Sequence, residues 1–469
     1  MTGLHATRRR VQAVGLQLLI AAVLAATVIV AAPANDALAT PGAAVEPVTT
    51  AKTVKAKVDA PYTPKAGTVF NNPRGSRKKK RAIITRIDRA IDGSAKGSTI
   101  RMAMYLFDLS STADRLIRAH RRGVHVQLIL DDGEDSKQYK KVRHALGNNK
   151  SKGSYIFRCK RGCMSSVRSV QHAKFYLFTR VGDAQRVSLI SSANPYTGNT
   201  GRSWNDLHTI IGNQTIWNSL NRYFTDMLRD KTNYNYYRTT TSGKYTLYFF
   251  PRTPPRGTAG VPQLSALKQV KCTGVAKGYG MNGRTTIRVA MWGWTKWRTD
   301  IARQLWTLHN RGCNVYVVLN KRRVGEKVFQ ALLKRSSKHG VMRVYDAWYG
   351  QRLYMHQKLV TINGNYAGDS SSKVLFTGSQ NFTDEGNRVN NELLMQIRDN
   401  STLDRYVRNL NYIRDRHTHG RIRRVPPSSY FHSGSAARTQ GADADGHLNG
   451  AEPFDDYDLP ANGDVDFDR

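Results

Sequence analysis

The sequence predicts an α/β fold of two similar tandem α-β-α lobes, with one functional site between them. Short apolar runs typical of buried strands alternate along the chain with amphipathic segments typical of helices, and this order occurs twice. A His-x-Lys triplet also occurs twice, as His172-Ala173-Lys174 and His356-Gln357-Lys358, which begin 184 residues apart. A single triplet of this kind often arises by chance. Two copies in matching surroundings indicate one site built from two halves.

The repeat extends well beyond the triplets. Thr99–Tyr105 reappears as Thr286–Trp292, and Arg122–Val126 reappears as Arg311–Val315. Further matches join Phe70–Arg74 to Phe249–Arg252, Asp206 to Glu392, and Arg222-Tyr223 to Arg405-Tyr406, with all offsets between 178 and 189 residues. Solenoid repeats span roughly 20 to 50 residues, so a period of this length is that of a domain. We therefore expect a duplication, with lobes at residues 68–244 and 245–425.

The elements of the first lobe follow from its apolar spacing and its turn residues. We expect helices at residues 82–92 and 113–121, the second ending before Gly123. The expected strands are residues 100–107, 124–130, 174–178 and 187–191. The second lobe repeats this order from Tyr245 to about His419. Such alternation favours a mostly parallel or mixed sheet with helices on its faces.

The two ends of the chain differ from the lobes. Arg8-Arg9-Arg10 precedes an apolar stretch from Ala13 to Ala32, which predicts a signal peptide cleaved after Ala39 and a secreted protein. The alternative is an uncleaved membrane anchor, because about 20 apolar residues can span a bilayer. Residues 40–67 are expected to form a flexible linker. Residues 426–469 are expected to form a disordered acidic tail.

Four cysteines suit a secreted chain with disulfides. Cys159 and Cys163 are near enough in sequence to close a small loop, which would leave Cys272 to pair with Cys313. Four cysteines allow three connectivities, and the sequence leaves all three open. A zinc site is the competing interpretation, but the spacing lacks two C-x-x-C pairs.

The formal net charge of +39 is extreme. The last 29 residues hold nine acidic residues and one arginine, so they carry −8 and the remainder carries +47. Attraction to polyanions follows, which makes nucleic acid, anionic phospholipid surfaces and acidic wall polymers the candidate partners. The densest basic run, Arg77 to Arg81, equally fits a solvated run at the start of a helix.

A small-residue turn ending in asparagine follows each triplet: Ser191-Ser192-Ala193-Asn194 and Gly378-Ser379-Gln380-Asn381. With these turns, residues 68–420 resemble the phospholipase D superfamily, whose signature His-x-Lys-x-x-x-x-Asp and Gly-Ser-x-Asn occurs twice. The resemblance implies a duplicated phospholipase D-type sandwich. Thr179 and Asn363 stand where the signature has Asp, as in branches such as the tyrosyl-DNA phosphodiesterases. In the family this Asp supports the site more than it performs chemistry.

The triplets predict phosphodiester chemistry. Residues i and i+2 of a strand share a face, so each histidine should project beside its lysine. One imidazole can attack phosphorus while the other protonates the leaving oxygen. Lys174, Lys358, Asn194 and Asn381, with the hydroxyls of Ser192 and Ser379, can stabilise the phosphoryl charge, so neither a catalytic metal nor a cofactor is expected. The resemblance implies His172 as nucleophile and His356 as general acid.

Each histidine also needs a group that holds its other ring nitrogen. The repeat-matched acids Asp206 and Glu392 are the candidates, because a carboxylate orients an imidazole and stabilises its charged form. The alternative for both is an ordinary surface acid.

The resemblance implies a phosphodiesterase of the phospholipase D type that acts through a covalent phosphohistidine. Its expected secretion, its aromatic residues and its cationic surface favour phospholipid head groups as the groups that it hydrolyses or transfers. A metal-independent extracellular nuclease and a non-catalytic polyanion-binding protein are the alternatives. We expect a monomer that contacts anionic membranes peripherally and can bind nucleic acid through its basic surface. Aromatic residues of the second lobe fit either core packing or a site rim that enters lipid or stacks on bases: Trp292, Trp294, Trp297, Trp306, Trp348, Tyr349 and Tyr354.

Overall fold

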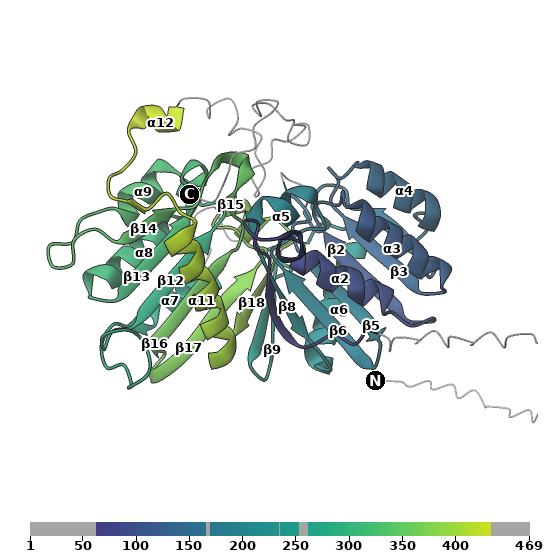
Figure 1. Cartoon of the computed structure of the whole chain (residues 1–469), viewed down its shortest axis with the longest axis horizontal. Coiled ribbons are helices and arrows are strands. Elements are labelled where there is room, and N and C mark those ends of the chain that lie inside the picture. Colours follow the sequence, from purple (N-terminus) through teal and green to yellow (C-terminus); the bar gives the residue numbers. More distant parts are fainter. Residues whose placement is uncertain (1–61, 166–168, 234, 253–260, 433–469) are drawn as a thin grey trace, which may run out of the picture. The chain divides into compact units, whose positions relative to one another are not determined.

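The computed structural model describes residues 62–165, 169–233, 235–252 and 261–432. The expected signal peptide and most of the expected linker and tail therefore lie outside the described residues. The described part is a mixed α/β structure with two large sheets, one in each lobe (Figure 1). The duplicated α/β architecture predicted from the sequence is thereby confirmed.

The first sheet has the strand order β1-β8-β6-β5-β2-β3-β4 within the described residues. Its members are β1 (Gly67–Phe70), β2 (Thr99–Met104), β3 (His125–Leu130), β4 (Tyr155–Arg158), β5 (Phe175–Val181), β6 (Ala184–Ser191) and β8 (Asp206–Ile210). The strands β2, β3 and β4 are parallel, whereas β5, β6, β8 and β1 pair antiparallel. The sheet is thus mixed. Its three parallel strands are joined by helical crossover connections, one from β2 to β3 and one from β3 to β4.

Helices cover both faces of this sheet (Figure 1). One face packs against α2 (Ala82–Asp92), α3 (Ser110–Arg121) and α4 (Lys137–Leu146), whose apolar side chains join those of Ile100, Met102 and Val126 in one core. The other face packs against α6 (Gln214–Leu228). The short α1 (Arg77–Lys80) has no buried residue, so its basic side chains are in solvent at the point where the helical region begins.

The second sheet has the order β19-β14-β13-β12-β16-β17-β18-β10-β9 in the described chain, with β11 beside β16. These strands are β9 (Arg238–Ser242), β10 (Tyr245–Phe249), β11 (Val270–Lys271), β12 (Thr286–Met291), β13 (Asn314–Leu319), β14 (Arg343–Asp346), β16 (Leu359–Tyr366), β17 (Asp369–Gly378), β18 (Leu393–Ile397) and β19 (Arg421–Ile422). The strand β9 precedes the expected boundary at residue 245 and yet pairs with β10 in this sheet.

The helices of the second lobe follow the plan of the first. One sheet face packs against α7 (Pro262–Lys268), α8 (Thr299–Asn310) and α9 (Glu326–Leu332) in a single apolar cluster. The opposite face packs against α11 (Asn400–Arg416). A third cluster joins the lobes, because Leu220 and Phe224 of α6 share it with Leu375 and Leu393 of the second sheet. The interior of the protein is therefore continuous between the lobes.

Several expectations differ from the structure in detail. The expected strand at residues 100–107 ends at Met104, and the expected helix at 113–121 begins at Ser110. The tail expected to be disordered from residue 426 begins with a short helix, α12 (Ser428–His432). The structure also joins Cys159 to Cys163 and Cys272 to Cys313, which is one of the three connectivities left open. No helix in the described ranges has the length and apolarity needed to cross a bilayer.

Candidate active site between the lobes

Each His-x-Lys triplet lies in extended chain immediately before a strand, not inside one. His172 and Lys174 precede β5, and His356 and Lys358 lie between β15 (Tyr354–Met355) and β16. The expectation that both triplets are strand residues was wrong in this respect. Their backbone is fixed by the other lobe instead: the amide of His172 donates to the carbonyl of Asn391, and that of His356 donates to Trp204, both at 3.0 Å.

This exchange follows the repeat. The short strand β15 pairs in parallel with β7 (Ser203–Trp204), and Gln171 forms an isolated parallel bridge with Asn391. Each triplet is thus attached to the segment that follows the small-residue turn of the opposite lobe. Two equivalent segments exchanged in this way place both histidines at the boundary between the lobes, as the doubled motif predicted.

His172 is held by a carboxylate. Its Nδ1 lies 2.7 Å from Oε1 of Glu392, and both side chains are fully buried. The other carboxylate oxygen of Glu392 accepts a hydrogen bond from the hydroxyl of Ser379. A carboxylate beside Nδ1 accepts a hydrogen bond from the proton on that nitrogen, which leaves Nε2 unprotonated in the neutral ring and directs it toward the site. Glu392 is therefore placed where the sequence expected a supporting acid, although it acts on the histidine of the other lobe.

His356 is held by an amide oxygen. Its Nδ1 lies 2.7 Å from Oδ1 of Asn205, which also accepts a hydrogen bond from the hydroxyl of Ser192 at 3.1 Å. The amide nitrogen of Asn205 donates to the hydroxyl of Ser203 at 2.8 Å. These bonds orient the amide so that its oxygen faces the imidazole. Sequence reasoning did not find Asn205.

Asp206 does not hold a histidine, which corrects the expected match with Glu392. Its Oδ2 accepts hydrogen bonds from Thr377 and Tyr406, each at 2.7 Å, and burial raises the pKa of the carboxyl. The pairs Ser192–Asn205 and Ser379–Glu392 are both separated by 13 residues, so Asn205 is the true equivalent of Glu392. Counting from the serine of each turn would have found it, whereas choosing the nearest acid placed the match one residue too far.

Both lysines of the triplets are buried beside their histidines. Nζ of Lys174 donates to the backbone oxygen of His172 at 2.6 Å, and Nζ of Lys358 lies 3.1 Å from Nε2 of His356. Both amines are hydrogen-bond donors that an anionic ligand at this position can accept from. The ring of Tyr105 lies 5.4 Å from both Nζ of Lys174 and the ring of His172 and forms the wall of the first half-site.

The turn asparagines are also buried. Oδ1 of Asn194 accepts from the amides of Tyr105 and Leu106 at 3.1 and 3.2 Å, so this side chain fixes the end of β2. Its amide nitrogen donates to Asn199 at 3.2 Å, which leaves a second amide proton to donate to a ligand. Asn381 occupies the equivalent place at the end of β17.

The residues at the signature Asp positions act far from the histidines, as local supports of the sheets. Oγ1 of Thr179 accepts from the amide of Thr99 at 2.8 Å, and Oδ1 of Asn363 accepts from the amide of Gly280 at 3.0 Å. Each therefore supplies the side-chain acceptor that an aspartate would supply.

Aromatic side chains form the wall of the second half-site. The ring of Trp292 lies 5.5 Å from that of His356 and 4.7 Å from that of Tyr354, and Arg323 lies 5.1 Å above Trp292. Trp292, Trp294 and Tyr354 are buried, whereas Trp297 is 36% exposed. Trp292 and Tyr354 thus line the site, whereas Trp294 and Trp306 pack with the apolar cluster of α7, α8 and α9.

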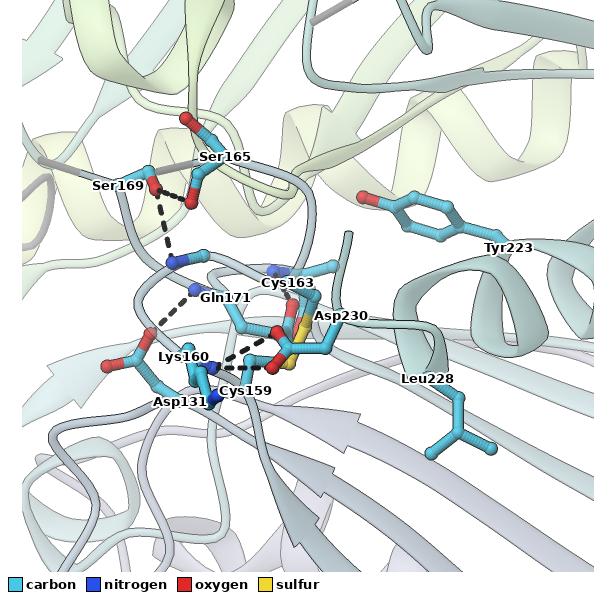
Figure 2. The surroundings of a disulfide bond; sticks show 12 residues. Asp131, Cys159, Lys160, Cys163, Ser165, Ser169, Gln171, Tyr223, Leu228 and Asp230 are labelled. Carbon is cyan, nitrogen blue, oxygen red and sulfur yellow. Dashed lines mark hydrogen bonds between the residues drawn. A yellow bond between two sulfur atoms is a disulfide. The ribbon is translucent and has the colours of Figure 1, made fainter. Parts of the chain in front are cut away.

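The disulfide of Cys159 and Cys163 lies near Ser169 and Gln171, the residue before His172 (Figure 2). Beyond it, the hydroxyl of Ser169 accepts from the amide of Gly162 at 3.1 Å, and Asp131 accepts from the amide of Gln171 at 2.6 Å. This network holds the chain next to the first triplet. Over the described residues, no group of three or more His, Cys, Asp or Glu side chains could bind a metal ion.

Comparison with known families matches both lobes. A family model described as cardiolipin synthase, PLD-like domain, covers residues 87–228 and 281–414, which include both triplets and both turns. No curated protein sequence matches the chain.

Solved structures with similar folds share little sequence with the chain. Phosphatidylserine synthase of Haemophilus influenzae is 13% identical, with a TM-score of 0.50 over 80% of this chain and 94% of that one. Polyphosphate kinase of Porphyromonas gingivalis is 14% identical with a TM-score of 0.46, over 74% of this chain and 50% of that one. The chain therefore spans half the length of the kinase. Yeast tyrosyl-DNA phosphodiesterase is 11% identical, with a TM-score of 0.41 over 71% and 90% of the two chains.

Proposed function

Because the chain belongs to the phospholipase D superfamily, we propose that it cleaves or transfers a phosphodiester through a covalent phosphohistidine on His172. The observation that carries the proposal is the pairing of each buried histidine with a polar side chain of the opposite lobe. Each imidazole is thereby oriented through Nδ1, so that Nε2 is the reactive nitrogen. Two oriented imidazoles are what a two-step displacement at phosphorus requires.

In the first step, Nε2 of His172 attacks phosphorus while the bond from phosphorus to the leaving oxygen breaks. A proton from Nε2 of His356 passes to that oxygen, which departs as an alcohol. In the second step, water or an alcohol attacks the phosphorus of phosphohistidine and returns its proton to His356. The bond between phosphorus and Nε2 then breaks, and both histidines regain their starting forms.

The two different partners support this division of roles. A phosphohistidine with a proton on Nδ1 carries a positive charge on the ring, which the carboxylate of Glu392 stabilises directly. An amide oxygen, as supplied by Asn205, orients an imidazole without holding a positive charge so strongly. His356 can then release and recover its proton within one cycle, which is the task of a general acid and base.

The lysines have a matching task. A bound phosphodiester brings negative charge to Lys174 and Lys358, and its oxygens can accept the hydrogen bond that Lys358 donates to Nε2 of His356 in the free protein. Once that bond is exchanged, the phosphate charge favours the protonated form of His356. Binding of substrate would in this way prepare the general acid.

For the substrate we propose a phospholipid head group. The matching family model is described as cardiolipin synthase, and the fold is shared with a phosphatidylserine synthase, so both names refer to phospholipids. The basic body supports attraction to an anionic lipid surface, at about 1 kcal/mol per well-placed Lys or Arg. The test is release of head groups from phosphatidylcholine and phosphatidylglycerol vesicles. No release or exchange with any common phospholipid would reject the lipid substrate.

A metal-independent nuclease is the second candidate, and the net charge of +39 favours it. Incubation of single-stranded and plasmid DNA with EDTA separates it from a lipid enzyme and from a simple binder. Cleavage in the presence of chelator would support the nuclease. Retarded but intact DNA would support a non-catalytic polyanion-binding protein, since strong binding alone is expected of any protein this basic at low salt.

We further propose that the protein is exported. Two disulfides within the described residues fit an oxidising compartment, and the basic and apolar N-terminal segment fits an export signal. Mass spectrometry of the protein from the culture medium tests this. A mature N-terminus at Thr40 is the expected result, and retention of the intact chain in the cell membrane would favour an anchor.

A further inference from the structure

A second basic site lies on the face of the second sheet that is covered by α11, toward the amino end of β12. We call it the Arg288 cluster: Arg288, Tyr316, Arg343 and Arg414. The three guanidinium carbons lie 5.4, 5.0 and 5.1 Å from the centre of the Tyr316 ring. In the register of the sheet, Tyr316 stands between Arg288 on one side and Arg343 on the other.

Arg288 is the unusual member. Its side chain is only 9% exposed, its Nε is buried without a hydrogen-bond partner, and no acceptor contacts its guanidinium among the described residues. Burial lowers the pKa of Arg288, and the nearby Arg414 acts in the same direction. A buried charge with no acceptor is strongly unfavourable, so such groups are normally paired.

The equivalent arginine of the first lobe shows what is missing. By the repeat, Arg288 corresponds to Arg101, whose Nε donates to Gln127 at 2.7 Å and whose guanidinium also bonds Asn221. In the second lobe, Tyr316 replaces Gln127 in register, and Asp404, the counterpart of Asn221, is engaged by Lys373 at 2.8 Å. Neither equivalent of the two acceptors is therefore bonded to Arg288, and Arg343 and Arg414 stand nearby in addition.

The Arg288 cluster has fewer carboxylates than arginines. Asp415 is bound to Arg414 through two hydrogen bonds at 2.7 and 2.9 Å, and Arg343 bonds the hydroxyl of Tyr316 at 3.2 Å. Among the described residues, the three arginines of the cluster thus have one acid bonded to them. Arg343 is exposed and Tyr316 is half-buried, so the cluster is open to solvent and to small ions.

We propose that the Arg288 cluster binds a phosphate-class oxyanion, at a site distinct from the two histidines. Guanidinium groups present forked donors that match the oxygens of phosphate, and several of them around one anion make a strong site. The anion would supply the acceptors that Arg288 lacks and would offset the repulsion between the three arginines. The source is either free phosphate or the phosphate of a small ester.

Equilibrium dialysis with radiolabelled inorganic phosphate tests the proposal without any need for turnover. Wild-type protein should bind one phosphate more per chain than Arg288→Gln. The matched control is Arg101→Gln, the same change at the repeat-equivalent position, which should retain the full number of sites. Competition with glycerol 3-phosphate then distinguishes the two sources of the anion. If the ester displaces the labelled phosphate, the site also binds phosphate esters; if it does not, the site binds the free ion. Either result supports the proposal.

Thermal unfolding provides a second measurement that does not depend on counting sites. In buffer without phosphate, Arg288→Gln should unfold at the same or a higher temperature than wild type, because it removes a buried unpaired charge. Added phosphate should raise the unfolding temperature of wild type more than that of the variant, because ligand binding stabilises the folded state. Equal numbers of phosphate sites in the two proteins, or an equal rise in unfolding temperature, would overturn the proposal. A failed diesterase assay would leave it untouched.

Discussion

His172 and His356 occupy equivalent places in the two lobes but meet chemically different partners. The first faces the carboxylate of Glu392 and the second faces the amide of Asn205, at the same distance of 2.7 Å. The serine that supports each partner is also equivalent. The duplication has therefore kept the geometry of the half-sites while their charge has diverged. That difference supports separate roles for two histidines that the sequence pattern alone leaves nearly interchangeable.

The largest expected effect comes from removing each histidine. His172→Ala should lower kcat about 10⁶-fold, because it removes the nucleophile, and the double variant should be little worse than this single one. His356→Ala should lower kcat roughly 10²- to 10⁴-fold, the usual contribution of a general acid. Steady-state kinetics of the three variants measure these losses. Full activity in either single variant would reject a site shared by the lobes.

A substrate with a good leaving group sharpens the comparison of the two histidines. An aryl phosphodiester needs no proton donor for departure, so it should restore much of the first step in His356→Ala. It should not rescue His172→Ala. His356→Ala should also accumulate more covalent intermediate, detected by mass spectrometry after acid-free quenching. Equal rescue of both variants would contradict the assignment of roles.

Changing the charge of the side chain at each Nδ1 tests the difference between the two histidines directly. Glu392→Gln should lower kcat by roughly 10⁴-fold, since loss of a carboxylate behind a catalytic imidazole has effects of this order. Asn205→Asp should change kcat less than tenfold. It should move the alkaline limb of the pH–rate profile to higher pH, because a carboxylate favours the protonated form of His356. An unchanged profile in Asn205→Asp would show that this side chain does not act on His356.

The two disulfides should separate stability from activity. In the chain-entropy model, a bridge across 41 residues stabilises the fold by about 4 kcal/mol, and one across 4 residues by about 2 kcal/mol. The double change Cys272→Ser with Cys313→Ser should therefore lower the free energy of unfolding more, as measured with urea. Cys159→Ser with Cys163→Ser should lower kcat more, because that bridge precedes the segment leading to His172. The reverse order in either measurement would contradict this division.

His208 should make the first lobe sensitive to acid. Its ring lies in hydrogen-bond contact with Thr68 and Tyr245, and burial lowers its pKa to about 3. The folded state therefore keeps the imidazole neutral, while the unfolded state takes up a proton below pH 6.5. The contribution to stability is full above pH 6.5 and is lost as pH falls toward 3, by about 2 kcal/mol at pH 5.

The check is the free energy of unfolding at pH 5 and pH 7.5. The difference between these values should shrink in His208→Gln relative to wild type. The exposed His144, in the same lobe, provides the matched control as His144→Gln and should leave the difference unchanged. If the free energy of unfolding fell by the same amount between pH 7.5 and pH 5 in all three proteins, the pH dependence would belong to other groups.

The sequence by itself determined the features that are local and repeated. The two triplets, the two turns and the offsets between them predicted the duplicated α/β architecture, which the fold and the family match confirm. The two cysteine pairs could be suggested because Cys159 and Cys163 are close along the chain. Such patterns are readable since each rests on the chemistry of neighbouring residues and on the length of one repeat. The roles of individual site residues stay predictions until activity is measured.

Only the tertiary structure decided which side chains face each histidine. Glu392 is 220 residues from His172, and Asn205 is 151 residues from His356, so no local pattern connects them. The sequence match selected Asp206 because it is the nearest acid, yet neighbouring residues in extended chain point to opposite sides. The match was therefore wrong by one residue: Asn205 lies beside His356, whereas Asp206 accepts hydrogen bonds from Thr377 and Tyr406. Matching acidic residues between the two repeats could not reveal which side chain faces the histidine. The direction of a side chain is set by the register of the strands and by the packing of one lobe on the other.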